Sequence, residues 1–218
     1  HRVSRRQRQM CIRDRMISFL VRDKNWNNYD PKILNYEENF DTSLKYIFDL
    51  EYGIDEILKT RNVILFSKNS ITLSSEGKFL TDFWTNRIGF NLLIPLQNHV
   101  GSNIIVTKGN DLKEKKQFPE NIKPDQPFFK FKNLAYTLDD SLLVNINFEG
   151  ILFEMEDQRN WGDASYKIYS GSLLNPFPYL EKGGSNFSQT VKIDVENKKQ
   201  RSFPVSYTHL TLPTTNSV

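Results

Sequence analysis

Apolar and polar residues alternate along short segments of this chain, and this period of two constrains its fold more than any other feature. Val191, Ile193 and Val195, for example, are separated by polar residues. Successive side chains of a β-strand point to opposite faces of a sheet, so this alternation is typical of a strand with one face in water. The dominant period is therefore that of β-structure, and helical signals are weak.

Several further segments have the length and residue types of strands, and turn residues separate them. They lie at residues 17–21, 44–50, 63–66, 71–73, 90–95, 104–107 and 144–148. Short strands at a spacing of roughly ten residues favour a sandwich of two sheets. We therefore predict an all-β fold, specifically an antiparallel β-sandwich.

Three connections carry signals of their own. The dipeptide 149–150, Glu-Gly, separates the alternating segments 144–148 and 151–155, which predicts a β-hairpin. The segment 117–127 contains three prolines, which predicts an irregular crossing. Residues 54–60 have the length of a single helical turn or a loop.

The two ends of the chain are related to each other as coding DNA. The codons CAG ATG TGT ATA AGA GAC encode residues 9–14, and their reverse complement encodes residues 205–210. The relation continues outward over fourteen positions at each end, and the string resembles the adapter of a transposase-based DNA library. We therefore expect residues 1–14 and 205–218 to be adapter-derived, with a natural β-sandwich domain at 15–204 that is a truncated fragment.

The charge balance changes once these ends are set aside. The full chain has 29 basic and 26 acidic residues and a net charge of +3. Without the arginines up to Arg15 and without Asp14, the counts fall to 23 and 25, and the net charge becomes about −2. The basic residues near the N-terminus therefore do not predict a nucleic-acid partner.

The residue inventory also excludes several classes of site. Cys11, the only cysteine, lies in an adapter-derived end, and His99 is the one histidine outside these ends. No disulfide, thiol nucleophile, metal site or cofactor is therefore expected. No apolar run is long enough to span a membrane, so we expect no membrane partner and a cytoplasmic location.

One segment, residues 154–167, is far richer in charged and aromatic residues than the rest of the chain. It reads EMEDQRNWGDASYK. Arg159 has the bidentate fork that suits a carboxylate, and Trp161 has an apolar face that suits a sugar ring. The neighbouring polar side chains suit hydroxyl groups. The predicted substrate-binding residues are Asp157, Arg159, Asn160, Trp161, Asp163 and Lys167.

A purely structural role explains the same segment equally well. Internal ion pairs such as Asp157–Arg159 or Asp163–Lys167 would clamp a loop without binding any ligand. The sequence leaves both interpretations open.

Other candidate residues carry weaker signals, and no catalytic residue is assigned. Glu154 and Glu156 share one face of a strand, about 7 Å apart, and form either an acid–base pair or a solvated face. Residues 22–26 and 86–90 each place an arginine beside a strand, where it serves a binding site or an ion pair. His99 is expected to be a surface loop residue.

The segment 153–161 and its continuation 163–167 resemble the N-terminal region of D-apionate lactonase-like proteins. Smaller matches agree in order and approximate spacing, at residues 22–26, 86–90, 126–128 and 176–179. Gly162 departs from the family pattern, where a threonine is expected.

The resemblance implies an N-terminal β-sandwich followed by a TIM-barrel-like domain and a small C-terminal β domain. It also implies further strands upstream of Ile17. The implied activity opens a branched sugar lactone to its acid, in bacterial catabolism of the plant sugar apiose. Catalysis is expected in the barrel, which this chain lacks.

Two functions follow from these observations. The first is an accessory N-terminal domain of a sugar-lactone hydrolase, which binds a sugar acid or lactone and packs against the missing barrel. The second is a carbohydrate-binding or purely structural β-sandwich module of another glycan-active protein. Because no base is evident, we expect the isolated chain to be inactive.

Overall fold

The structure, a computed structural model, describes residues 17–40, 43–54 and 56–198. The stretches expected to be adapter-derived, 1–14 and 205–218, and the strands expected upstream of Ile17 lie outside the described residues. The described part contains fourteen strands and one short 3₁₀ helix, η1 at Gln158–Trp161. The strands are β1 (Ile17–Asp23), β2 (Pro31–Asn39), β3 (Leu44–Tyr52), β4 (Leu58–Ser67), β5 (Ser70–Phe79), β6 (Phe83–Pro95), β7 (Asn103–Lys108), β8 (Lys113–Gln117), β9 (Phe128–Leu138), β10 (Leu142–Glu149), β11 (Phe153–Asp157), β12 (Ser165–Ser170), β13 (Tyr179–Glu181) and β14 (Asn186–Asn197).

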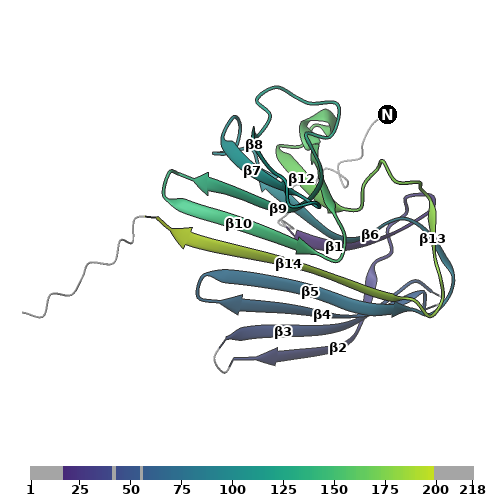
Figure 1. The fold of residues 1–218 in the computed structure, drawn as a ribbon. Coiled ribbons are helices and arrows are strands. Elements are labelled where there is room, and N and C mark those ends of the chain that lie inside the picture. The colour runs from purple at the N-terminus through teal and green to yellow at the C-terminus, as the bar shows by residue number, and fades with distance from the viewer. Residues whose placement is uncertain (1–16, 41–42, 55, 199–218) are drawn as a thin grey trace, which may run out of the picture.

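These strands form one large antiparallel sheet in the order β1-β6-β12-β11-β9-β10-β14-β5-β4-β3-β2 (Figure 1). Three strands lie off this path: β13 pairs with β6, β7 with β9, and β8 with β7. The consecutive strands β1 and β2 stand at opposite ends of the order. The prediction of an all-β, antiparallel fold is confirmed, and a single curved sheet produces its sandwich-like layering.

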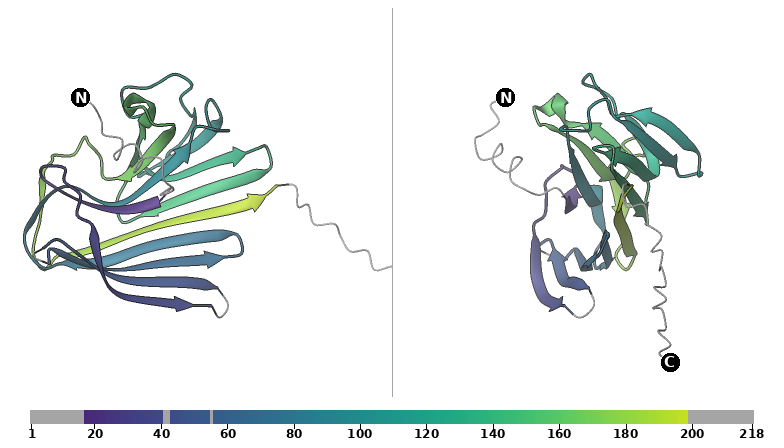
Figure 2. Two further views of the ribbon diagram at one scale, coloured as in Figure 1. Left: turned by 180° about the vertical axis from the view of Figure 1, so that it is seen from behind. Right: turned by 90° about the vertical axis from the view of Figure 1, so that its left-hand side faces the viewer.

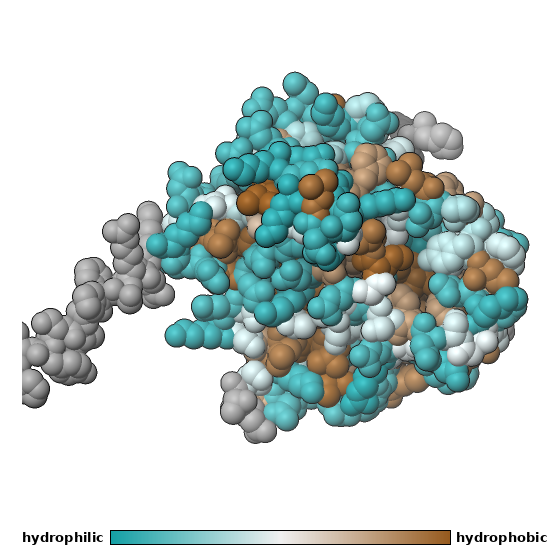
Figure 3. Space-filling model, in the orientation of Figure 1, coloured by the Kyte–Doolittle hydropathy of each residue, from teal (hydrophilic) through white to brown (hydrophobic). Residues whose placement is uncertain are grey.

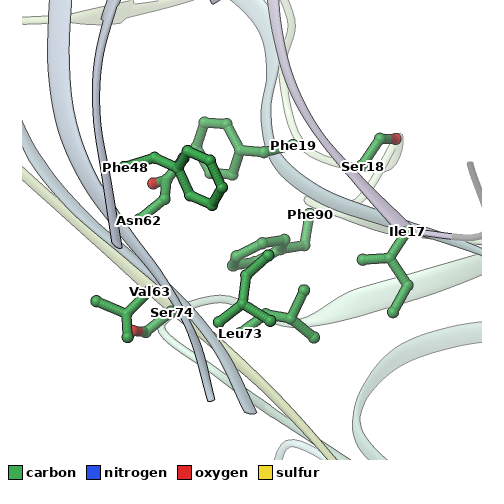
Figure 4. A pocket seen from close by; sticks show the side chains of 10 residues that line it. Ile17, Ser18, Phe19, Phe48, Asn62, Val63, Leu73, Ser74 and Phe90 are labelled. Carbon is green, nitrogen blue, oxygen red and sulfur yellow. The ribbon is translucent and has the colours of Figure 1, made fainter. Parts of the chain in front are cut away.

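The sheet curls so that its first strand packs against strands of its far half (Figure 2). The ring of Phe19 on β1 lies 5.9 Å from Tyr52 on β3 and 5.4 Å from Phe187 on β14. A small apolar cavity of about 140 Å³ remains between these layers, and Figure 4 shows Phe19, Phe48 and Phe90 around it.

The main core lies where β6, β7, β9, β10, β11 and β12 present their inward-facing residues. Its largest fully buried side chains include Phe118, Phe131, Phe153, Met155 and Ile168. Burying each such side chain contributes about 2 kcal/mol. A second, smaller core joins β1 to β3, β4 and β6 and includes the buried residues Tyr52, Leu58 and Ile88.

The strand at the far edge of the sheet is more exposed than the rest. Every residue of β2 is solvent-accessible, including Ile33 and Tyr36. Figure 3 shows that apolar side chains reach the surface in separate patches, with polar side chains between them. Among the described strands, β2 pairs only with β3.

The predicted strand segments lie within observed strands except 151–155, which begins two residues before β11, and the predicted hairpin is wrong. β10 pairs with β9 and β14, whereas β11 pairs with β9 and β12, so β9 separates them. Both strands still face one core, where the rings of Phe148 and Phe153 lie 4.3 Å apart. Alternation identified the two strands and their buried faces but not their neighbours.

Three connecting regions were also predicted from the sequence. Of the irregular crossing predicted at 117–127, residues 118–127 contain no helix or strand, and Gln117 is the last residue of β8. The surface position expected for His99 is wrong, because its side chain is 5% exposed and packs between Phe118 and Tyr136. Residues 54–60 supply the start of β4 at Leu58 rather than a helix in their described part.

Candidate functional site

The polar segment 154–167 folds as a strand, a tight helical turn and a second strand. Asp157 ends β11 and caps η1, where its side chain accepts a hydrogen bond from the Arg159 amide. Asp is favoured at this position because its carboxylate satisfies a free amide. Gly162 ends η1 with φ 77°, a left-handed conformation that favours glycine. The chain then returns as β12, antiparallel to β11.

Arg159 and Asp157 form an ion pair inside the domain. Arg159 Nη2 donates to Asp157 Oδ2 at 2.7 Å, and Nε donates to Oδ1 at 2.9 Å. The guanidinium also donates to the carbonyl oxygens of residues 119–121, on the irregular crossing. The Asp157 side chain is fully buried and accepts a further bond from the Lys123 amide. The pair therefore fastens the crossing to the end of β11.

This environment sets the charge of the carboxylate. Burial would raise the pKa of Asp157, but hydrogen bonds from the Arg159 guanidinium and from the Lys123 and Arg159 amides together hold it below its ordinary value. Asp157 is therefore an ionised structural anchor at neutral pH, as the structural interpretation of the segment proposed.

Asn160 and Asp163 also make contacts within the domain. The Asn160 side-chain amide donates to the carbonyl oxygens of Lys123 and Asp157. Asp163 accepts a 3.4 Å hydrogen bond from Ser165. Ligand binding by these residues and by Arg159 stays a prediction, since none of these contacts involves a ligand.

Trp161 and Lys167 instead face a pocket of about 520 Å³ on the surface of the domain, which we call the cation–aromatic pocket. Segments far apart in the sequence meet there: β1 with the loop that follows it, β6, the polar segment and the loop before β13. Its lining residues are Arg22, Trp26, Arg87, Glu156, Gln158, Trp161, Lys167, Leu173 and Phe177.

Arg87 is the most buried cation of this pocket, with 7% of its surface exposed. Its guanidinium carbon lies 3.7 Å from the centre of the Tyr169 ring and 5.6 Å from that of Trp26. Among the described residues, no hydrogen bond or ion pair reaches its side chain. Burial is the largest effect and lowers the pKa of Arg87; Tyr169 opposes it, the positive charge of Arg22 lowers the pKa further, and Glu156 and Glu154 oppose that decrease.

Arg22 stands directly opposite Arg87 on the neighbouring strand. Its Nε donates to Asn28 at 2.8 Å, and its guanidinium carbon lies 5.8 Å from the centre of the Trp26 ring. Burial lowers the pKa of Arg22, and the charge of Glu156 opposes this effect. No ion pair with a described residue involves either arginine, so the strand-end ion pairs considered from the sequence are not found in this part.

The opposite wall of the pocket is held by Glu156. Its carboxylate accepts a 2.7 Å hydrogen bond from the Trp161 indole and lies 4.0 Å from Lys167 Nζ. Trp161 is 76% exposed. This indole is therefore oriented by Glu156 while most of its surface remains open to a ligand or another domain.

Glu154 lies behind the pocket and does not line it. It is fully buried, and its Oε2 accepts hydrogen bonds from the Tyr169 hydroxyl at 3.2 Å and the Leu173 amide at 3.1 Å. It thereby holds the ring on which Arg87 stacks. The different surroundings of Glu154 and Glu156 favour positioning roles for both carboxylates.

The sequence marked four of the pocket residues only weakly. Arg22, Trp26 and Arg87 belonged to short arginine-containing groups, and Phe177 to a small family match. Their shared signal was an arginine or an aromatic residue beside a strand end. Their convergence depends on the order of the strands, which the pattern of alternation does not contain.

The described residues hold no group of three or more His, Cys, Asp or Glu side chains placed to bind a metal ion. Within the same part of the chain, no helix is long and apolar enough to cross a membrane.

Comparison with known proteins gives a family match over most of the chain. The profile of the N-terminal domain of D-apionate lactonase matches residues 7–198. The D-apionate lactonase of Brucella anthropi is 32% identical over 191 residues, which cover 85% of this chain and 31% of the relative. The chain therefore spans about a third of the length of that curated relative.

Solved structures show a similar fold at low sequence identity. Two GH36 α-galactosidases of Geobacillus stearothermophilus, AgaA in complex with 1-deoxygalactonojirimycin and AgaB, each match with a TM-score of 0.50. They are 14% and 12% identical, and the matches cover 82% and 85% of this chain and 30% of each galactosidase. At these identities the likeness concerns the fold alone.

Proposed function

The chain belongs to the family of D-apionate lactonase N-terminal domains, and from this premise we propose that it is the accessory domain of a sugar-lactone hydrolase. Its cation–aromatic pocket contributes side chains that hold the substrate, a lactone of a branched sugar acid related to D-apionate. The reacting groups belong to a further domain that this chain does not contain.

The observation that carries the proposal is the convergence of separate polar and aromatic segments on one pocket. Trp161 and Lys167 come from the predicted motif, and Arg22, Trp26 and Arg87 join them from β1, the loop that follows it and β6. Small-molecule sites combine apolar and aromatic walls with a few placed polar groups. An exposed indole stacks on the apolar face of a sugar ring, while cations bind its oxygen atoms.

The same pocket supports positioning rather than chemistry. Lactone hydrolysis requires a base or metal that activates water, and donors for the developing oxyanion. Lys167 and the two arginines are donors, but the lining includes no histidine, and its one carboxylate, Glu156, contacts Trp161 and Lys167. We therefore propose that the domain orients the substrate for a catalytic barrel.

The test is a kinetic measurement on the whole protein that contains this chain. The full coding sequence of the protein that contains this chain is recovered, the protein is expressed, and hydrolysis of D-apionate lactone is followed by acid release. We expect Trp161→Ala to lower kcat/KM about tenfold, the loss of roughly 1.4 kcal/mol of transition-state binding. Trp84→Ala is the matched control, because Trp84 is also exposed but does not line the pocket.

Two outcomes would overturn this function. A whole protein without lactone-hydrolysing activity would favour a carbohydrate-binding module of another glycan-active protein. Equal kcat/KM values for wild type and Trp161→Ala would favour a purely structural domain. The cytoplasmic location, the role in apiose catabolism and the domain bounds at 15–204 stay predictions.

A further inference from the structure

Two arginines face each other across neighbouring strands, an arrangement that is unfavourable without an anion. Arg22 on β1 and Arg87 on β6 are cross-strand partners. Residues directly opposite in an antiparallel pair project from the same face, and like charges there destabilise the sheet. The mutual repulsion contributes to the lowered pKa of Arg87.

Among the described residues, no carboxylate forms an ion pair with either arginine. Glu156 is the only carboxylate among the pocket residues, against three cations, and it contacts Trp161 and Lys167. Glu154 accepts hydrogen bonds from the Tyr169 hydroxyl and the Leu173 amide. The guanidinium of Arg87 is therefore buried against aromatic rings, and the charges of Glu154 and Glu156 act on it without an ion pair.

The shape of the pocket limits what the anion can be. A volume of about 520 Å³ lies within the range of small-ligand sites, roughly 300–1,000 Å³. Guanidinium groups bind planar carboxylates through two parallel hydrogen bonds. The aromatic lining of Trp26, Trp161 and Phe177 suits a carbon skeleton that carries this carboxylate.

We propose that Arg87, with Arg22 opposite it, binds the carboxylate of a small polyhydroxy acid, so the pocket that holds the lactone also binds the ring-opened sugar acid formed from it. This inference rests on the proposed function and adds the acid form to the ligands of the pocket. Arg87 anchors the carboxylate, Arg22 adds a second positive charge, and Trp161 and Lys167 contact the hydroxyl-bearing chain.

The three tryptophans of the chain provide a direct test by NMR of the purified 218-residue protein. Trp26 and Trp161 line the pocket, whereas Trp84 does not. Sodium gluconate is titrated while the indole N–H signals are recorded, each assigned from a Trp→Phe variant. We expect the Trp26 and Trp161 signals to shift with a common Kd while the Trp84 signal stays in place.

Sorbitol and inorganic phosphate show separately how much the carboxylate and the hydroxyl chain of gluconate contribute to binding. Sorbitol keeps the hydroxyl chain of gluconate but lacks the carboxylate, and we expect its Kd to be at least about tenfold higher. Phosphate is an anion without a hydroxyl chain and should also bind more weakly. Equal affinity for gluconate and sorbitol, or for gluconate and phosphate, would overturn the assignment.

Substitution of Arg87 identifies the anchor. Arg87→Met should weaken gluconate binding at least about tenfold, and Arg87→Lys should restore part of it, because lysine keeps the charge but not the fork. Arg61→Met is the control, since Arg61 lies on β4 and pairs with Glu37 and Asp49 away from the pocket. Unchanged gluconate binding by Arg87→Met would contradict the proposal.

A stability measurement separates binding from a structural role. Removing an unpaired buried charge should leave the melting temperature of the free protein unchanged or raise it, whereas a structural arginine would lower it. Should Arg87→Met not fold, Arg87 is structural and the assignment fails. Failure of gluconate binding alongside Trp161-dependent lactone hydrolysis would refute this inference and leave the proposed function standing.

Discussion

Arg159 and Arg87 show how one residue type serves two purposes within a single domain. Arg159 is surrounded by a carboxylate and three backbone carbonyls, so its hydrogen-bonding capacity is used inside the protein. Arg87 stacks on aromatic rings and contacts no described acceptor. The sequence marked both arginines, but only the fold decides which of them is free to bind a ligand.

The Asp157–Arg159 pair gives a prediction about stability. Arg159→Ala removes one partner and leaves a fully buried carboxylate, which should lower the free energy of unfolding by about 3 kcal/mol. Urea denaturation measures the change. Trp161→Ala, two positions along the chain and mostly exposed, should change stability by less than about 0.5 kcal/mol. Equal effects of the two substitutions would contradict the structural role of Arg159.

The same pair predicts a dependence on pH. The pKa of Asp157 is lowered in the folded state, so its contribution is complete above the unfolded value, about 3.9, and is lost as the pH falls through the folded value. The stability difference between wild type and Asp157→Asn should therefore be constant near neutral pH and shrink below about pH 4. Denaturation curves from pH 7 to pH 2 measure this difference; one that stayed constant throughout would refute the prediction.

At the scale of elements, sequence predicted the strands better than their partners. Alternation identified the core-facing residues of β10 because burial there follows the period of two, whereas in β11 Glu154 is buried as well as Phe153 and Met155. The pairing of β11 with β12 rather than β10 depends on β9, which lies between them. Several strands with little alternation were missed, including β2, which is exposed throughout, and β13, which has three residues.

The turn at Gly150 shows what replaced the predicted hairpin. Gly150 has φ 94°, and a Cβ there would lie 2.2 Å from the Ser188 carbonyl oxygen on β14. This close approach lets the chain leave β10 and pass to β11. Only glycine meets both conditions, the positive φ and the short backbone contact.

Alanine substitution at two glycines separates these conditions. Gly184 has a similar φ of 91°, but a Cβ there meets nothing within 4 Å. Gly184→Ala should lower the free energy of unfolding by about 1–2 kcal/mol through backbone strain alone. Gly150→Ala should lower it by more, because the backbone around Ser188 must also shift. Urea denaturation measures both free energies of unfolding. Equal decreases for the two variants would show that the backbone near Ser188 moves away from the new Cβ without loss of stability.

At the scale of the whole molecule, the proposed function assigns the catalytic base to a domain outside this chain. We expect the isolated protein to leave the hydrolysis of D-apionate lactone at its rate in buffer, within the error of an acid-release assay. Binding of gluconate by the same preparation shows that the pocket is formed. A rate above the buffer rate that Trp161→Ala abolishes would place catalysis in this domain.

Because the sheet curls, a substitution at Phe19 on β1 should affect both hydrophobic cores. Phe19 on β1 contacts both cores, through Phe90 on one side and Tyr52 on the other. Since β1 and β2 stand at opposite ends of the strand order, this ring links parts of the sheet that are distant along the hydrogen-bonded path. Its contribution should therefore exceed that of a half-buried phenylalanine within one arm of the sheet.

Phe66 on β4 is the matched comparison, because it is also half-buried but has one described ring contact, with Tyr46 on the neighbouring strand. Phe19→Ala should lower the free energy of unfolding by about 3 kcal/mol, and hydrogen exchange should quicken in β3 and β4 as well as in β1 and β6. Phe66→Ala should quicken exchange only in β3 and β4. If Phe19→Ala affected only β1 and β6, the two ends of the sheet would be independent, and the curl would be a consequence of strand twist rather than of packing between the cores.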